Sequence, residues 1–172
     1  SLNFSGLEKD SGFQLTLPLL KKVIAAVFYG DGLMCLANQV RPYENQPGTA
    51  DALVDRWTAE IARQFHAGRG TAKRDMAANF AAMAGQFAGV PVTYSPKVKV
   101  GVVGEIYVKY SPLGNNGLEA FLHGEDCEVN LPGLMGFVQY CIENTSETIR
   151  LYGGSGAVRV GADALQSWLS SR

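Results

Sequence analysis

One stretch decides which folds this chain can adopt: the apolar run over residues 98–104, which lies within KVKVGVVGEIYV. The run opens with alternating residues and becomes almost continuously apolar at Val100, Val102 and Val103. A strand that is apolar on both faces is typical of the interior of a parallel sheet that helices cover on both sides. We therefore expect residues 98–104 to form a central strand with helices above and below it.

The residues after this run predict further elements in a regular order. NNGLEAFLHG predicts a short helix, which Asn115 or Asn116 caps and Gly124 ends. CEVNLPG predicts a second strand and LMGFVQYCIENT a second helix. TIRLYGGSG fits either a third strand or a loop, and AVRVGADALQSWLSS predicts a last helix. This order predicts an α/β fold, with a partial Rossmann-like subdomain built on a parallel βαβ unit over residues 90–172.

The first half of the chain, residues 1–89, predicts a helical arm that packs on the α/β part. After a polar lead-in over residues 1–12, apolar residues recur every three or four positions in three segments between residues 16 and 87. Gly30 and Gly32 interrupt the first segment, so one kinked helix and two consecutive helices both fit this pattern.

The composition excludes several kinds of partner. Lys and Arg number 15 and Asp and Glu number 16, which gives a net charge of −1 and no cationic field for binding nucleic acid. The longest apolar tract, VIAAVFYGDGLMCLA, is broken by Asp31 and is shorter than the roughly 20 apolar residues that a membrane-spanning helix needs. We therefore expect no nucleic-acid partner and no membrane partner.

Three cysteines, Cys35, Cys127 and Cys141, are too widely spaced for a disulfide framework, and no CxxC pair is present. We expect all three to be reduced and mostly buried. Reduced thiols, and an N-terminal segment without the basic and apolar regions of a signal peptide, predict a cytoplasmic protein. The chain begins without Met, so we also expect it to be a piece of a larger protein.

The loop after the first predicted strand carries most of the candidate binding residues. In open α/β sheets, ligands bind beyond the carboxyl ends of the strands. At that edge the chain offers one carboxylate, three hydroxyls and two amides. Tyr110 carries one of the hydroxyls, and the candidate binding residues are Glu105, Tyr107, Ser111, Asn115 and Asn116. A structural interpretation stays open for several of them, with Glu105 as a solvated strand end and the asparagines as helix caps. The chain has neither a GxGxxG fingerprint nor a P-loop lysine signature, so we expect no NAD or ATP site of the usual kind.

Arg41 is a further candidate binding residue, in the connection RPYENQPG between two predicted helices. An arginine in this setting forms either a local salt-bridged joint or a site for a phosphate of a CoA ligand. His66 and His123 follow predicted helix ends and have no partner ligands at metal spacing, so we interpret both as structural. The sequence predicts no catalytic residue and no metal ligand.

Three stretches carry a family resemblance: AAVFYGDGLMCLANQVRPYENQPGTADALVDRW, VGVVGEIYVKYSPLGNNGLEAFL and YGGSGAVRVGADALQSWL. In this order they resemble the 2-hydroxyacyl-CoA dehydratase component-like region of the activators of 2-hydroxyglutaryl-CoA dehydratase, also described as acyl-CoA dehydratase activase-related proteins. The resemblance covers roughly residues 15–170, nearly the whole chain.

The resemblance implies a larger parent protein, in which an ATPase module is coupled to a dehydratase-like module that can carry [4Fe–4S] clusters. The related dehydratases remove water from 2-hydroxyacyl-CoA substrates after an ATP-driven transfer of one electron. This chain then corresponds to a scaffold or substrate-binding part of the dehydratase-like module. Its partners are the remaining domains of the parent and an acyl-CoA ligand, while ATP and the cluster belong elsewhere in the parent.

Two functions therefore stay open. In the first, the chain is a part of the 2-hydroxyacyl-CoA dehydratase system and has no turnover of its own. In the second, it is a standalone α/β protein-interaction domain without catalysis, and the helical arm over residues 15–87 docks a partner.

Overall fold

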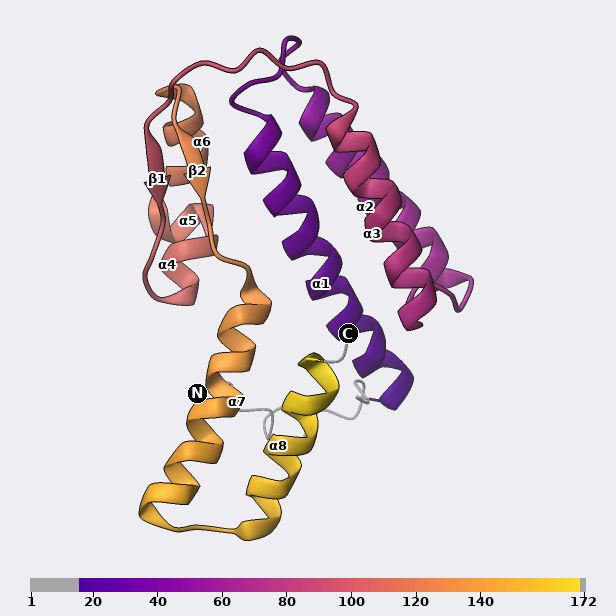
Figure 1. Cartoon of the computed structure of the whole chain (residues 1–172), viewed down its shortest axis with the longest axis vertical. Helices are drawn as coiled ribbons and strands as arrows, with labels where there is room; N and C mark the ends of the chain where they lie inside the picture. The colour runs from indigo at the N-terminus through magenta and orange to yellow at the C-terminus, as the bar shows by residue number, and fades with distance from the viewer. Residues whose placement is uncertain (1–15, 171–172) are drawn as a thin grey trace.

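The structure, a computed structural model, describes residues 16–170, so the expected polar lead-in over residues 1–12 lies outside the described residues. In the described part of the chain, eight helices and two short strands follow one another (Figure 1). In chain order they are α1 (Leu17–Val40), α2 (Thr49–His66), α3 (Lys73–Ala88), β1 (Lys99–Gly101), α4 (Ile106–Tyr110), α5 (Pro112–Asn115), α6 (Leu118–Gly124), β2 (Glu128–Asn130), α7 (Leu134–Tyr152) and α8 (Gly156–Ser170).

The Rossmann-like α/β prediction is wrong, because the structure is 69% helix and only 5% strand. β1 and β2 do pair in parallel, in the register that places Val100 beside Val129. This sheet has only these two strands, and β1 spans only Lys99–Gly101. Within the segment expected as a central strand, residues 98–104, only Lys99–Gly101 forms a strand, and it is an edge strand. The molecule is mostly helical, and its parallel βαβ unit is small.

The apolar run fails to form a central strand because only one of its faces is covered. Val102 is 8% exposed and packs in a small cluster with buried residues around β2, whereas Val103 is 82% exposed. Gly104 then takes a φ of 143°, which favours glycine, and the Glu105 side chain caps the start of α4. The strand thus ends at Gly101, earlier than expected, and α4 begins at Ile106, where a loop was expected.

α1 is one continuous helix, so the two glycines do not divide it. Its buried residues recur every four positions and form one stripe: Ala25, Tyr29, Leu33 and Ala37. Gly32 permits a close approach of α3, since a Cβ atom at this position would lie 2.5 Å from Cε1 of Phe80. A Cβ atom at Gly30 would meet no atom within 4 Å. The two glycines therefore differ in purpose, and only Gly32 is required by packing.

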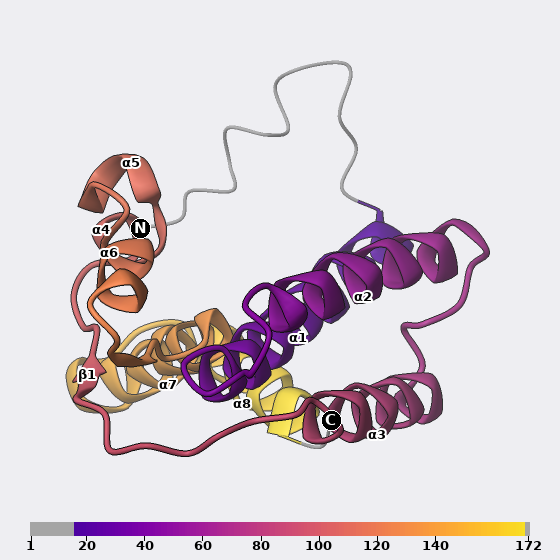
Figure 2. The same cartoon turned by 90° about the horizontal axis from the view of Figure 1, so that it is seen from above.

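α2 and α3 pack beside α1 to form the larger of the two cores (Figures 1 and 2). Tyr29 crosses this core, and its hydroxyl donates to the carbonyl oxygen of Gly70 at 2.8 Å. Asn79 donates to the same hydroxyl oxygen at 2.9 Å. Burial raises the pKa of the Tyr29 phenol. The link fixes the turn between α2 and α3 against the middle of α1.

A carboxylate in the middle of α1 fixes the start of α7. Asp31 accepts hydrogen bonds from the backbone N–H of Leu134, at 2.8 Å, and of Met135, at 2.7 Å. The first N–H groups of a helix have no partner within it, and a negative charge near them is favourable. Gly133 allows this approach, because a Cβ atom there would lie 2.6 Å from Oδ2 of Asp31. Residues more than a hundred positions apart in the chain are joined in this way.

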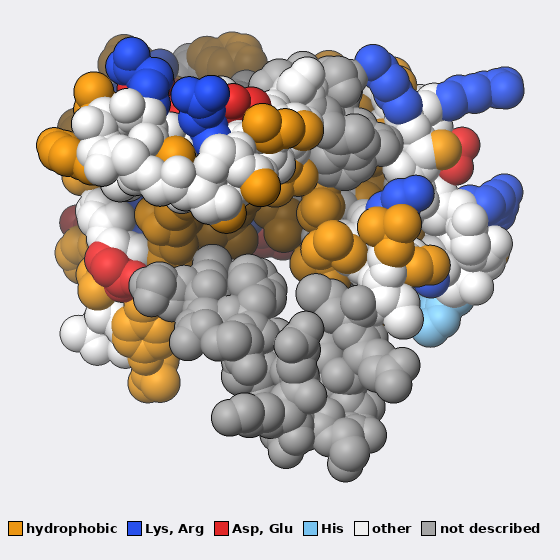
Figure 3. Space-filling model, turned by 90° about the horizontal axis from the view of Figure 1, so that it is seen from below, with side chains coloured by type: hydrophobic (Ala, Val, Ile, Leu, Met, Phe, Trp, Pro, Cys, Tyr) orange, Lys and Arg blue, Asp and Glu red, His pale blue; other side chains and the backbone are white. Residues whose placement is uncertain are grey.

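α7 and α8 form a helical hairpin that extends away from the rest of the molecule (Figure 1). TIRLYGGSG is neither a third strand nor wholly a loop, because α7 continues to Tyr152 and only residues 153–155 connect it to α8. The lower face of the molecule shows apolar side chains mixed with Lys and Arg (Figure 3). Met135 is the one buried residue of α7, so the hairpin depends on its attachment near Asp31.

None of the described helices is both long enough and apolar enough to cross a membrane. The cysteines are free thiols, but the prediction that they are mostly buried is wrong. Cys35 and Cys141 are exposed and Cys127 is half-buried. Cys35 and Cys141 lie on the solvent side of their helices, next to positions that belong to the apolar stripe. The spacing of apolar residues alone therefore led to the wrong prediction that they are buried.

Candidate functional site

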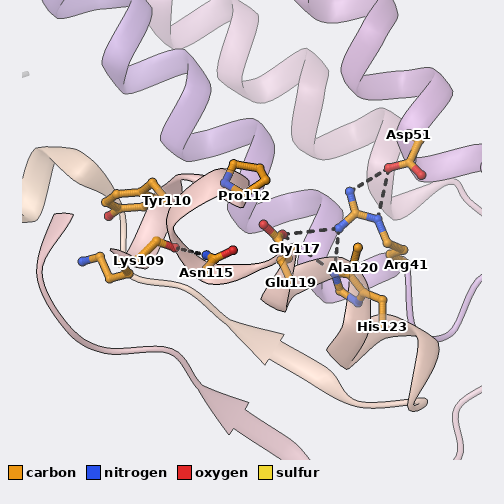
Figure 4. Close-up of a pocket in the computed structure, with 10 residues that line it drawn as sticks. All are labelled: Arg41, Asp51, Lys109, Tyr110, Pro112, Asn115, Gly117, Glu119, Ala120 and His123. Carbon is orange, nitrogen blue, oxygen red and sulfur yellow. Dashed lines mark hydrogen bonds and ion pairs between the residues drawn. The ribbon is translucent and has the colours of Figure 1, made fainter. Parts of the chain in front are cut away.

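A polar pocket of about 500 Å³ lies where the end of α1 and the start of α2 meet α4, α5 and α6 (Figure 4). This volume is within the usual range for small-ligand sites. The residues that line it come from all five helices and their connections: Arg41, Asp51, Lys109, Tyr110, Pro112, Asn115, Gly117, Glu119, Ala120 and His123. The pocket therefore joins the helical first half of the chain to the βαβ unit.

Arg41 is the central side chain of the pocket. It caps α1, its backbone N–H donates to the carbonyl of Ala37 at 2.8 Å, and Pro42 follows. Its Nη2 and Nε both donate to Oδ1 of Asp51, at 2.7 and 3.1 Å. Its Nη1 donates to Oδ1 of the buried Asn38 at 2.7 Å. The guanidinium is thus held on the side of α1 and is only 23% exposed.

His123 approaches the same guanidinium from α6. Its Nε2 lies 2.9 Å from Nη1 of Arg41. A guanidinium only donates, so Nε2 accepts this hydrogen bond and the proton of the neutral ring is on Nδ1. Nδ1 is buried and has no partner among the described residues. An unpaired buried donor costs about 1–3 kcal/mol, so an acceptor that reached it would be stabilising.

Glu119 lies one helical turn before His123 and completes the charged group. Its Oε1 is 3.7 Å from Nη1 of Arg41 and 3.8 Å from Nε2 of His123. His123, followed by Asn38 and Arg41, holds the pKa of the Glu119 carboxyl below its ordinary value, against the opposing effect of burial. The 3.8 Å contact with His123 is an ion pair only when the imidazole is protonated, and Nε2 then no longer accepts from Arg41.

The opposite wall of the pocket is built by α4 and α5. Lys109 extends over the ring of Tyr110, with Nζ 4.6 Å from the ring centroid. Asn115 holds the turn in place, since its Oδ1 accepts from the N–H of Leu118 at 3.1 Å and its Nδ2 donates to the carbonyl of Lys109 at 3.4 Å. Gly117 makes this turn possible with a φ of 69°. The Asn115 amide is thus used within this wall, and the Lys109 ammonium points away from Arg41 (Figure 4).

Two of the six predicted binding residues, Arg41 and Asn115, line this pocket. The other four lie nearby, within α4 or at helix ends, and are not among the lining residues. Glu105 caps α4 by accepting from the N–H of Tyr107 at 2.8 Å, and Ser111 precedes α5. Asn116 ends α5 with a φ of 55°. Tyr107 is 55% exposed, and its ring lies against Gly114.

Four pocket residues with charged or titratable side chains were missed as site residues in the sequence: Asp51, Lys109, Glu119 and His123. His123 was interpreted as structural. Glu119 and His123 are four positions apart on a predicted helix, which is the spacing at which side chains meet, and this signal was present in the sequence. No local signal connects either of them to Arg41, because that contact depends on the tertiary structure.

A second polar group lies on the other side of the βαβ unit. The hydroxyl of Tyr43 donates to Oε2 of Glu128, and Nζ of Lys99 is 3.1 Å from Oε1 of the same carboxylate. These contacts, with Tyr43 first, lower the pKa of Glu128, and the carboxylate raises the pKa of the Tyr43 phenol. Tyr43 follows Arg41 closely in the chain, so the RPYEN connection holds β2 as well as α6.

The described residues include no group of three or more His, Cys, Asp or Glu side chains that could hold a metal ion. The three cysteines lie on α1, before β2 and on α7, so they do not fit an iron–sulfur cluster, and no chemistry is assigned to one in this chain. No family model, curated protein or solved structure matches the chain. The site is therefore interpreted from its own geometry.

Proposed function

We propose that this chain is a scaffold and ligand-binding part of a 2-hydroxyacyl-CoA dehydratase activator system, and that its pocket binds a phosphate of an acyl-CoA. One observation carries the proposal. Two of the segments on which the resemblance rests are far apart in the sequence and meet at one pocket, since RPYEN supplies Arg41 and VKYSPLGNN supplies Lys109 and Asn115.

The guanidinium of Arg41 is the group that supports a phosphate ligand, and Asp51 and Glu119 place two carboxylates beside it. Arg41 offers paired N–H donors, which match phosphate oxygens, and the stem of Lys109 lines the opposite wall with its ammonium over the ring of Tyr110. Asp51 occupies the guanidinium in the ligand-free chain, but its side chain is 59% exposed. A phosphate that binds here replaces the two hydrogen bonds that Arg41 donates to Oδ1 of Asp51.

The proposed role is binding and not turnover by this chain alone. Among the described pocket residues none is positioned as a nucleophile with an adjacent base, although Nδ1 of His123 has no partner there. ATP hydrolysis and electron transfer are accordingly assigned to the remaining domains of a cytoplasmic parent protein. The acyl end of the ligand extends beyond this pocket, toward those domains.

Isothermal titration of the full chain with coenzyme A tests the proposal. We expect Arg41→Met and Asn115→Ala each to weaken binding, Arg41→Met about tenfold or more, because a charge-assisted hydrogen bond contributes about 1.5–3 kcal/mol. Glu105→Gln is the matched control, since Glu105 lies in the same loop region but outside the pocket. This variant should bind coenzyme A with the affinity of the unchanged chain.

Two results would contradict the proposal. The first is an absence of heat and of thermal stabilisation at millimolar coenzyme A, since a ligand at a hundred times its Kd stabilises a protein by about 2.7 kcal/mol. The second is a loss of binding in Glu105→Gln with none in Arg41→Met. A comparison with coenzyme A that lacks the 3′-phosphate shows which phosphate occupies the pocket.

A further inference from the structure

His123 brings an imidazole ring into the pocket, and such rings in general gain or lose a proton between about pH 5 and 8. Nδ1 of this ring already holds a proton, because Nε2 accepts the hydrogen bond from Nη1 of Arg41 at 2.9 Å. Nε2 is therefore the atom that a further proton joins, and this proton converts it from an acceptor into a donor. The hydrogen bond from Arg41 is then lost, because a guanidinium has no acceptor to offer.

The charges that surround this ring favour one more positive charge when an anion binds. Arg41, at the end of α1, and Glu119, on α6, both lie close to Nε2, while Asp51, on α2, accepts from the guanidinium (Figure 4). With a neutral imidazole these side chains carry one positive and two negative charges, and this excess of negative charge opposes an anionic ligand. With a protonated imidazole the charges balance, and the pocket gains a second charged donor beside the guanidinium.

The other charged side chains that the elements around α6 carry are directed elsewhere. The ammonium of Lys109, on α4, lies over the ring of Tyr110. The carboxylates of Glu128, on β2, and of Asp126, just before β2, are paired with lysines in and before β1. A change of charge on the imidazole therefore acts mainly on the guanidinium beside it and on the carboxylate of its own helix.

We propose that His123 binds the phosphate together with Arg41, and that binding of the phosphate takes up one proton from solvent at Nε2 of this ring. The inference rests on the function proposed above, because it concerns the same pocket and the same ligand. The two donor nitrogens are 2.9 Å apart, so they can bind two oxygens of one phosphate, as the paired nitrogens of a guanidinium do. The carboxylate of Glu119, 3.8 Å from Nε2, stabilises the protonated ring. When the ligand leaves, the proton is released and the hydrogen bond from Arg41 forms again.

Proton uptake makes the affinity for the phosphate depend on pH. A ligand that prefers the protonated ring binds more tightly as the pH falls, and by linkage it strengthens the binding of the proton by the same factor. The extra affinity is present at about pH 5.5 and is lost as the pH rises to about 8. We expect the protonated ring to bind the phosphate about tenfold more tightly than the neutral ring, because a hydrogen bond from a charged donor is roughly twice as strong as a neutral one. The lowered pKa of Glu119 keeps its carboxylate ionised over this range.

Isothermal titration of the full chain with coenzyme A, at about pH 5.5 and about pH 8, tests the inference. The 3′-phosphate of this ligand titrates in the same range, so the unchanged chain is compared with His123→Gln, which keeps the proton of the ligand and removes that of the ring. We expect the ratio of the affinity at the lower pH to that at the higher pH to be about tenfold larger in the unchanged chain than in His123→Gln. The chain has two histidines, and His66→Gln is the matched control, because His66 is exposed at the end of α2 and lies outside the pocket. Its ratio should equal that of the unchanged chain.

A pH titration of the ring signals of His123 by nuclear magnetic resonance tests the same coupling without a substitution. Saturation with coenzyme A should move the midpoint of this titration to higher pH and leave that of His66 in place. An equal pH dependence of binding in the unchanged chain and in His123→Gln, or an unmoved midpoint at saturation, overturns the inference and leaves the proposed function intact. An absence of coenzyme A binding at both pH values contradicts the proposed function and this inference with it.

Discussion

Removal of the Asp31 carboxylate should loosen the attachment of α7 to α1. Asp31 accepts two short hydrogen bonds, at 2.8 and 2.7 Å, from the first N–H groups of α7. A capping side chain contributes about 0.5–2 kcal/mol, and a negative charge at a helix N-terminus adds about 0.3–1 kcal/mol. We therefore expect Asp31→Ala to lower the free energy of unfolding by about 1–3 kcal/mol.

Faster amide exchange at the start of α7 would distinguish a local loosening of this helix from a general loss of stability. In Asp31→Ala the amides of Leu134 and Met135 should exchange with solvent faster than those of α2, as measured by amide hydrogen exchange, and urea unfolding should give the total loss. Asp31→Asn keeps one acceptor oxygen, so its free energy of unfolding should lie between those of the unchanged chain and of Asp31→Ala. Asp55→Ala, which removes an exposed carboxylate from α2, is the control. Equal stability of Asp31→Ala and Asp55→Ala would refute the reasoning.

Three further predictions concern the helical core and the pocket. Urea unfolding should show that Gly30→Ala stabilises the chain by about 0.5–1 kcal/mol, whereas Gly32→Ala destabilises it by about 1–3 kcal/mol because its Cβ atom presses on Phe80. Tyr29→Phe should cost about 1–3 kcal/mol in the same assay, since it leaves a buried carbonyl without its donor. The lowered pKa of Glu119 implies a contribution to stability that is present above its ordinary pKa of 4.5 and is lost as the pH falls through the lower value in the folded chain. Unfolding midpoints measured down to acidic pH should therefore fall less steeply in Glu119→Gln than in the unchanged chain.

Much of the order of elements could be predicted from the sequence, but α4 and α5 lie where a loop was expected, and the size of the sheet could not be predicted. The helices were visible from apolar residues at every third or fourth position, and the parallel pairing of two strands was confirmed. The extent of the first strand was wrong because the valines at 100, 102 and 103 give the same pattern whether one or both faces are covered. Only the structure shows that Val103 faces solvent and that the strand ends before Gly104.

The residues of the candidate site could also be predicted only in part from the sequence. Arg41 and Asn115 were identified from their residue type and their place next to helix ends, and both line the pocket. Glu119 and His123 had the spacing of a helical pair, but their meeting with Arg41 depends on how α6 packs against the end of α1. Such long-range contacts leave no trace in the local pattern of a single sequence.

The most direct test of the central claim is a nuclear magnetic resonance titration of the full chain with coenzyme A, observed at side-chain resonances. The account predicts that the Nε–H signal of Arg41 and the side-chain amide of Asn115 shift together, with one affinity, and that both shifts disappear in Arg41→Met. Shifts confined to residues outside the pocket, such as the side-chain amide of Asn116, or no shifts at millimolar ligand, would contradict it.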